Sequence, residues 1–124
     1  MTADWVGMTK DLRLGLREMR TGAPEVMKSF AAIAQAALQP KALDLKTKEL
    51  IALAISVAVR CDDCIAFHTK GAVDQGATRD EILETLGMAI YMGAGPSAMY
   101  AAHALEAYTQ FAEKAEGSRE DHGR

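Results

Sequence analysis

The sequence has few of the residues that favour β-strands and few prolines. Aromatic residues make up 6% of the 124-residue chain and there are only 3 prolines, whereas alanine, leucine and methionine are abundant. The abundant residues are good helix formers, and strands prefer aromatic and β-branched residues. The composition therefore predicts an all-α protein. The sequence contains neither a glycine-rich phosphate loop nor a strand to precede one, so we expect no flavin, haem or nucleotide cofactor.

The chain also lacks an excess of charge of one sign and a long, unbroken apolar segment. Its formal net charge is -3 and its pI is about 5.6, so no basic surface for nucleic acid is expected. The N-terminal sequence MTADWVGMTKDLRLG does not read as a signal peptide. No run reaches the ~20 continuous apolar residues of a membrane span. We expect a cytoplasmic protein that binds neither nucleic acid nor a membrane.

Apolar spacing and helix-capping residues predict about six helices in a single domain over residues 1–124. In the first four helices, glycine, proline and an aspartate mark the boundaries. A charged tail over residues 115–124 is expected to fray. The expected boundaries are Gly22 and Pro24 between the first two helices, Pro40 after the second, Asp44 before the third, which runs to about residue 59, and Gln75 and Gly76 at the end of the fourth.

The last two predicted helices follow a capping box. Thr78 and Glu81 form a T-x-x-E sequence that opens the fifth helix. The sequence GAGP at 93–96 interrupts it, and Pro96 suits the first turn of a sixth helix. The residues expected to face inward are Ile82, Leu86, Ile90 and Gly93 in the fifth helix and Ala98, Met99, Ala102 and Leu105 in the sixth.

Two segments lack charge for longer than a small monomer can bury. Residues 50–59 contain no charged residue, and neither do residues 85–105, which glycine and proline interrupt. A helix that is apolar on all sides must be covered on all sides. We therefore expect a homo-oligomer whose subunits bury these surfaces against each other.

The only two cysteines, Cys61 and Cys64, are followed by His68. On a helix these three side chains fall at i, i+3 and i+7 and share one face. Sulfurs three residues apart can form a disulfide, and an imidazole one turn later can take the proton of the second thiol. In a reducing compartment a CxxC pair is more often catalytic or metal-binding than structural. The spacing predicts a redox site.

A proton relay is expected around the second cysteine. Cys64 is the expected attacking sulfur because His68 can accept its proton, and Cys61 then converts the sulfenic acid into a disulfide, although the reverse order stays open. Glu49 lies far from the cysteines along a continuous helix. A chain reversal near Arg60 would place it opposite the imidazole, where it could orient the ring.

The two residues between the cysteines act against thiolate formation. Asp62 and Asp63 carry negative charge beside both sulfurs, which disfavours another anion and holds a disulfide more firmly. If Cys61 begins a helix, the helix dipole acts in the opposite direction and favours its thiolate.

The combined pattern resembles a known family. The sequence KTKELIALAISVAVRCDDCIAFHTKGAVDQGAT, with a glutamate, eleven residues and then C-x-x-C-x-x-x-H, is similar to the alkylhydroperoxidase D-like branch of the carboxymuconolactone decarboxylase superfamily. The resemblance extends from about Leu43 to Phe111. It implies an all-helical fold that assembles as trimers or hexamers, with a thiol-based peroxidase or disulfide reductase activity. The positions that match the proton-relay and redox residues of the family are Glu49, Cys61, Cys64 and His68.

The resemblance also implies partners. The substrate is a hydroperoxide or a disulfide, and the electrons come from a thiol donor such as a lipoyl-bearing dehydrogenase system or a peroxiredoxin. The best-studied peroxidases of this branch have a histidine immediately before the second cysteine, where this chain has Asp63. This difference bears on the strength of any peroxidase activity. Members that decarboxylate a muconolactone generally lack the cysteine pair, so the superfamily name does not define the activity.

Two other interpretations stay open. Both cysteines and His68, with His103 as a fourth ligand, could hold zinc, although structural zinc sites usually lie on loops of domains that have little core. The chain could also be a structural helical assembly module whose thiols are bystanders. The other side chains considered, which we expect to pack or to be solvated, are Trp5, Tyr91, Tyr100 and His122.

Overall fold

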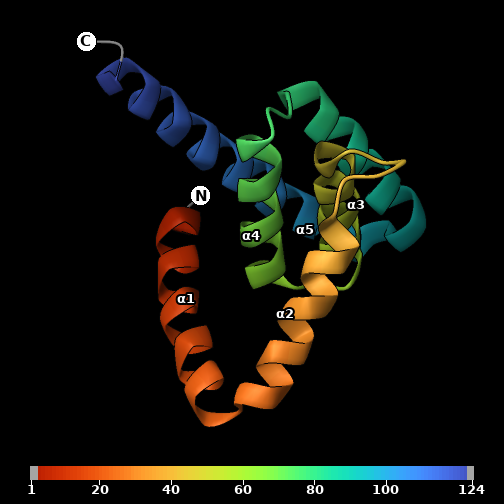
Figure 1. The fold of residues 1–124 in the computed structure, drawn as a ribbon. Coiled ribbons are helices and arrows are strands. Elements are labelled where there is room, and N and C mark those ends of the chain that lie inside the picture. The colour runs from red at the N-terminus through yellow and green to blue at the C-terminus, as the bar shows by residue number, and fades with distance from the viewer. Residues whose placement is uncertain (1–2, 123–124) are drawn as a thin grey trace.

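The computed structural model describes residues 3–122, and within this range the chain is helical and contains no strand (Figure 1). The predicted all-α class is confirmed. The charged tail that was expected to fray from residue 115 continues as helix through His122, and residues 123–124 lie outside the described residues. The helices are α1 (Trp5–Gly22), α2 (Pro24–Leu38), α3 (Leu45–Ala58), α4 (Asp62–Asp74) and α5 (Arg79–His122).

Helix α5 combines the predicted fifth and sixth helices across a kink. Ala94 has φ 58° and ψ -143°, which is not helical, and Pro96 follows two residues later. Proline cannot donate a backbone hydrogen bond, so the helix breaks where the GAGP sequence predicts a break. The predicted fifth and sixth helical segments are therefore both present, joined as one bent helix, which gives five labelled helices instead of about six. Within residues 3–122, no helix combines the length and hydrophobicity that crossing a bilayer requires.

The core lies among α3, α4 and α5, with one residue of α1 reaching into it. Leu53, Ile65 and Ile82 are fully buried, one from each of these three helices. Trp5 of α1 is 2% exposed, and its indole N–H donates to Glu106 at 3.1 Å. The indole therefore joins the start of the chain to the second half of α5.

The inward face of α5 differs in part from the predicted one. In the first segment Ile90 is exposed and Ala89 lies in the core instead. In the second segment Met99 and Ala102 face outward. The prediction was wrong there because the segment is apolar on several sides, and its periodicity does not select one face. The buried residues of α5 are Ile82, Leu86, Ala89, Ser97, Ala101, Ala104, Ala107 and Phe111.

Helix α2 has an apolar face that this chain does not cover. It forms a V-shaped arm with α1 (Figure 1), and none of its 15 residues is buried. Phe30 is 61% exposed, and Val26 and Ile33 are both 66% exposed. Apolar patches of this kind mark interaction surfaces.

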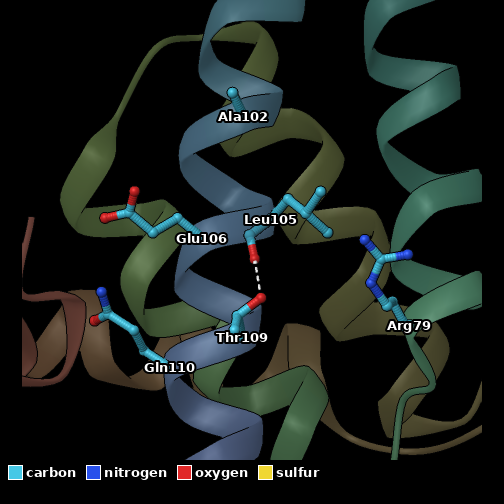
Figure 2. A pocket seen from close by; sticks show the side chains of 6 residues that line it. All are labelled: Arg79, Ala102, Leu105, Glu106, Thr109 and Gln110. Carbon is cyan, nitrogen blue, oxygen red and sulfur yellow. Dashed lines mark hydrogen bonds between the residues drawn. The ribbon is translucent and has the colours of Figure 1, made fainter. Parts of the chain in front are cut away.

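The two segments of α5 face each other across an open groove of about 470 Å³ (Figure 2). Arg79 lines it from the start of the first segment, and Leu105 and Thr109 are the labelled residues of the second segment on the side nearer to Arg79. The groove includes neither cysteine nor His68, so it is separate from the predicted redox site.

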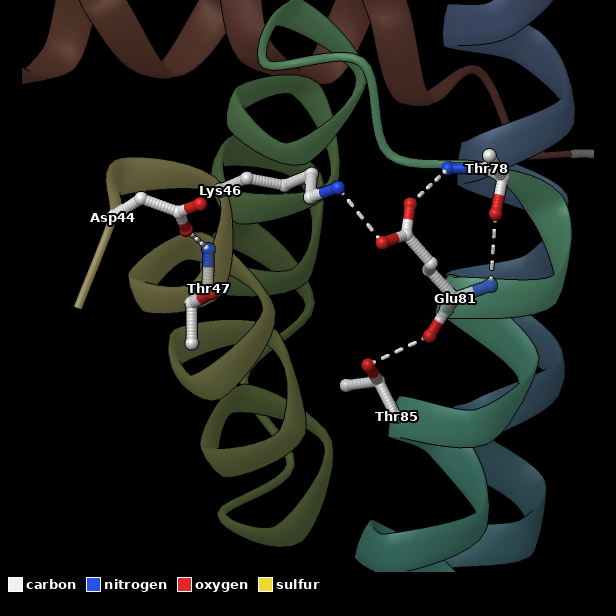
Figure 3. Close-up of polar contacts among 6 residues, drawn as sticks. All are labelled: Asp44, Lys46, Thr47, Thr78, Glu81 and Thr85. Carbon is white, nitrogen blue, oxygen red and sulfur yellow. Dashed lines mark hydrogen bonds and ion pairs between the residues drawn. The ribbon is translucent and has the colours of Figure 1, made fainter.

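Side chains join the starts of α3 and α5 (Figure 3). Asp44 caps α3 by accepting a hydrogen bond from the Thr47 backbone N–H at 2.8 Å. Thr78 and Glu81 form the predicted capping box, with bonds of 2.9 and 3.1 Å. The Lys46 ammonium lies 2.8 Å from Glu81 Oε2. The hydrogen bond from Lys46, followed by that from the Thr78 backbone, holds the pKa of Glu81 below its ordinary value.

Candidate functional site

The two cysteines lie at the start of α4 and are joined as a disulfide. Cys61 is the N-cap of the helix, and its Sγ accepts a hydrogen bond from the Cys64 backbone N–H at 3.2 Å. The Cα atoms are 5.2 Å apart, and both residues are half-buried. The predicted disulfide spacing is confirmed. The N-cap position also places Cys61 at the positive end of the helix dipole, which favours a thiolate there.

A short reversal connects α3 to α4. Arg60 has φ 63°, a left-handed conformation that ends α3, and the Cys61 backbone N–H donates to the Ser56 carbonyl at 3.0 Å. The reversal turns the chain back on itself, so that α3 and α4 pack against each other in opposite directions (Figure 1). The chain reversal predicted near Arg60 is therefore present.

The reversal brings Glu49 of α3 against His68 of α4. His68 Nδ1 lies 2.9 Å from Glu49 Oε2. Since the carboxylate accepts a hydrogen bond from Nδ1, the other ring nitrogen, Nε2, is left to exchange protons with a group outside the pair. His68 lies one helical turn after Cys64, so the Glu49–His68 half of the predicted relay is present, and the proton transfer from Cys64 stays a prediction.

Burial distinguishes the two members of this pair. The Glu49 side chain is 10% exposed, whereas the His68 side chain is 31% exposed. A buried carboxylate is costly unless it is hydrogen-bonded or paired with a charge. The imidazole thus stabilises the Glu49 carboxylate, and the carboxylate in turn fixes the orientation of the ring.

A second carboxylate–histidine pair lies at the other end of the motif. His103 Nδ1 of α5 is 2.9 Å from Asp62 Oδ1, which belongs to the first turn of α4. The His103 ring also contacts Trp5 and Tyr100, with ring centroids 5.9 and 5.0 Å away. The sequence did not reveal this pair because 41 residues separate its members.

The surroundings of His103 differ from those of a zinc ligand. Its Nδ1 contacts a carboxylate, and both sulfurs are bonded to each other. Within residues 3–122, no three histidine, cysteine or acidic side chains come together as a metal-binding group. The donor set proposed for zinc is therefore not assembled in this structure.

An open groove of about 520 Å³ adjoins the motif. Asp63 lines it together with residues that lie mostly in the first half of α1. The other residues that line the groove are Asp4, Gly7, Met8, Asp11, Leu12 and Gly15.

The remaining side chains considered from the sequence lie elsewhere. Trp5 packs in the core and contacts His103, whereas Tyr91 is 79% exposed and lies in none of the contacts described above. The His122 side chain lies outside the described residues.

Comparison with known proteins identifies one family. The family model described as the carboxymuconolactone decarboxylase family matches residues 24–107. An uncharacterized protein of Cupriavidus necator is 44% identical over 105 residues, which cover 79% of this chain and 93% of that protein. The family match takes in α2, α3, α4 and most of α5.

Solved structures agree with this match. A carboxymuconolactone decarboxylase family protein from Legionella pneumophila, crystallised in its apo form, is 54% identical with a TM-score of 0.85, and the match covers 87% of this chain and 96% of that one. A family protein from Thermotoga maritima, whose description suggests involvement in an antioxidative response, is 31% identical with a TM-score of 0.81 and coverages of 89% and 94%.

Proposed function

Because the chain belongs to the carboxymuconolactone decarboxylase family, we propose that it is a thiol–disulfide oxidoreductase that reduces hydroperoxides through Cys61 and Cys64. The observation that carries the proposal is the disulfide at the start of α4, with a carboxylate-bound imidazole one turn after its second sulfur. An involvement in an antioxidative response is suggested for the Thermotoga maritima relative, and reduction of hydroperoxides is compatible with it. This arrangement resembles the alkylhydroperoxidase D-like branch of the family.

The oxidative half of the reaction begins at Cys64. His68 takes the thiol proton, and the thiolate attacks the terminal oxygen of the hydroperoxide. The O–O bond breaks, Cys64 becomes a sulfenic acid, and the departing alkoxide takes the proton from the His68 imidazolium to give an alcohol. Glu49 holds the ring in place and stabilises the imidazolium.

Cys61 completes the cycle. Its thiol condenses with the sulfenic acid to form the disulfide and release water. An external dithiol then supplies two electrons and two protons, which regenerate both thiols and leave the donor as a disulfide. In the donor's attack on Cys64, Cys61 is the leaving group, and its N-cap position stabilises the thiolate that departs. A lipoyl-bearing protein or a peroxiredoxin fits this role.

The oligomer is part of the proposal. The uncovered apolar face of α2 fits a second copy of the same chain, since a copy would cover Phe30, Val26 and Ile33. The runs predicted to be shared between subunits also expose Ile55, which is 56% exposed, and Met99, which is 66% exposed. Assembly as trimers or hexamers would bury these residues.

A peroxide-consumption assay driven by dihydrolipoamide tests the function. We expect turnover by the wild type, none by Cys61→Ser or Cys64→Ser, and a roughly 100-fold lower rate for His68→Gln. Trapping with dimedone in Cys61→Ser should label Cys64 after one equivalent of peroxide, which would identify the attacking sulfur. Equal rates in all four proteins would reject the proposal.

A further inference from the structure

Gly71 occupies a position in α4 where glycine is unfavourable for the helix itself. It lies inside a 13-residue helix, three residues after His68, and therefore on the neighbouring part of the same face. Glycine in a helix interior destabilises the helix relative to alanine. The space around position 71 explains why a glycine is present there.

The Glu49 carboxyl group fills the space that a side chain at position 71 would need. A Cβ atom at Gly71 would lie 2.6 Å from Glu49 Cδ and 3.1 Å from Oε1, and nearer still to Oε2. Favourable contacts between carbon atoms lie at about 3.5–4.0 Å. Glu49 Oε2 is also the atom that contacts His68 Nδ1. The three heavy atoms nearest to a Cβ atom at position 71 all belong to the Glu49 carboxyl group.

Two exposed glycines show that a helical glycine need not have such a neighbour, although Gly7 and Gly93 also lie close to a side chain. A Cβ atom at Gly87, which is exposed on α5, would have no heavy atom within 4 Å, and the same holds for Gly15 of α1. Gly71 does not have a positive φ, so its backbone conformation is open to alanine. The restriction at position 71 is therefore steric, and it acts on the Glu49 side chain.

We propose that Gly71 is a positioning residue for the Glu49–His68 pair. The inference rests on the proposed function, in which Glu49 orients the imidazole that serves Cys64. A methyl group at position 71 displaces the carboxylate from His68 Nδ1. The fold survives, because the displaced atoms end a flexible side chain and alanine favours the helix.

Gly71→Ala and its matched control Gly87→Ala test the inference in the full-length protein. Both changes add one methyl group to a helix, and only the first meets the carboxylate. The first readout is the NMR spectrum of the histidine ring nitrogens, which does not depend on turnover. We expect the His68 Nδ1 shift and its pH profile in Gly71→Ala to match those of Glu49→Gln and to stay like wild type in Gly87→Ala. A wild-type His68 spectrum in Gly71→Ala overturns the inference.

Peroxide turnover gives the second readout. We expect Gly71→Ala to lose at least ten-fold in rate, Gly87→Ala to keep the wild-type rate, and the double variant Gly71→Ala/Glu49→Gln to lie within twofold of Glu49→Gln. A further ten-fold loss in the double variant would overturn the inference, since Gly71 would then act independently of Glu49. If Glu49→Gln itself turns over like wild type, the proposed relay fails, and the imidazole spectrum still decides the role of Gly71.

A stability cycle covers the case in which Gly71→Ala folds poorly. In Glu49→Ala the carboxyl group is absent, so the methyl group at position 71 has room and should raise the melting temperature. In the wild-type background the same change should raise it less or lower it. Equal effects of Gly71→Ala in the two backgrounds would contradict the contact.

Discussion

The two carboxylate–histidine pairs, each with one member on α4, have the same contact distance and differ in burial. Glu49–His68 and Asp62–His103 both have a carboxylate oxygen 2.9 Å from Nδ1. The Glu49 side chain is 10% exposed, whereas that of Asp62 is 43% exposed. Water can replace a lost partner at the surface but not in the interior. Equal distances therefore do not imply equal roles, and we expect the carboxylate of the buried pair to hold its ring more firmly than that of the exposed pair does.

The largest expected effect separates the two pairs by turnover. Glu49→Gln should lower the peroxide reduction rate by about 100-fold, because the imidazole loses the charge that orients and stabilises it. His103→Gln should lower the rate by less than about threefold, because its partner Asp62 is solvated. Initial rates at pH 7 with dihydrolipoamide provide the comparison. Similar losses in both variants would remove the distinction between the pairs.

A smaller effect concerns the reduction potential. Asp62→Asn should raise the potential of the disulfide by less than about 30 mV, which is a tenfold change in the equilibrium constant, because a negative charge beside Cys61 disfavours its thiolate. His103→Gln should lower the potential, because it leaves the Asp62 charge without its partner. Equilibration with a dithiol buffer of known potential measures both.

The double variant sharpens that prediction. In the Asp62→Asn background, His103→Gln has no charge left to expose and should not change the potential further. An effect of His103→Gln as large as in the wild type would show that His103 acts by packing against Trp5 and Tyr100 instead of through Asp62.

The smallest expected effect comes from a third ion pair, which is remote from the sulfurs. The pKa of Glu81 is lowered chiefly by its hydrogen bond with Lys46. A lowered pKa in the folded state stabilises the fold above the ordinary glutamate value of about 4.3, and this contribution is lost as the pH falls through the folded-state value. Lys46→Met should lower the melting temperature at pH 7 by less than about 3 °C. The difference should vanish near pH 2, and a difference that persists there would contradict the electrostatic origin.

Local signals in the sequence predicted most of the helices. Gly22 and Pro24, Asp44 and the Thr78–Glu81 capping box lie at helix boundaries in the structure. Each acts within a few residues, so the sequence alone contains the information. The inward face of the second segment of α5 was wrong, because alanine-rich sequence leaves the choice of face to tertiary packing.

The site residues also divide into those that the local sequence predicts and those that depend on tertiary packing. Cys61, Cys64 and His68 lie within one short segment, and the expected reversal at Arg60 brought Glu49 to the imidazole. The Asp62–His103 pair depends on how α5 packs against α4, and no local pattern reports that. Gly71 did carry a signal, since a glycine inside a helix and one turn from a functional histidine raises the question of what it makes room for.

The junction between α3 and α4 sets the register between the two helices. Glu49 precedes the bend at Arg60, and the sulfurs and the imidazole follow it, so the length of the connection decides which of these side chains face one another. One extra residue there, if it were taken into the helix, would rotate α4 by about 100° and shift it by about 1.5 Å relative to α3. The length of this connection is therefore as much a part of the site as the side chains it aligns.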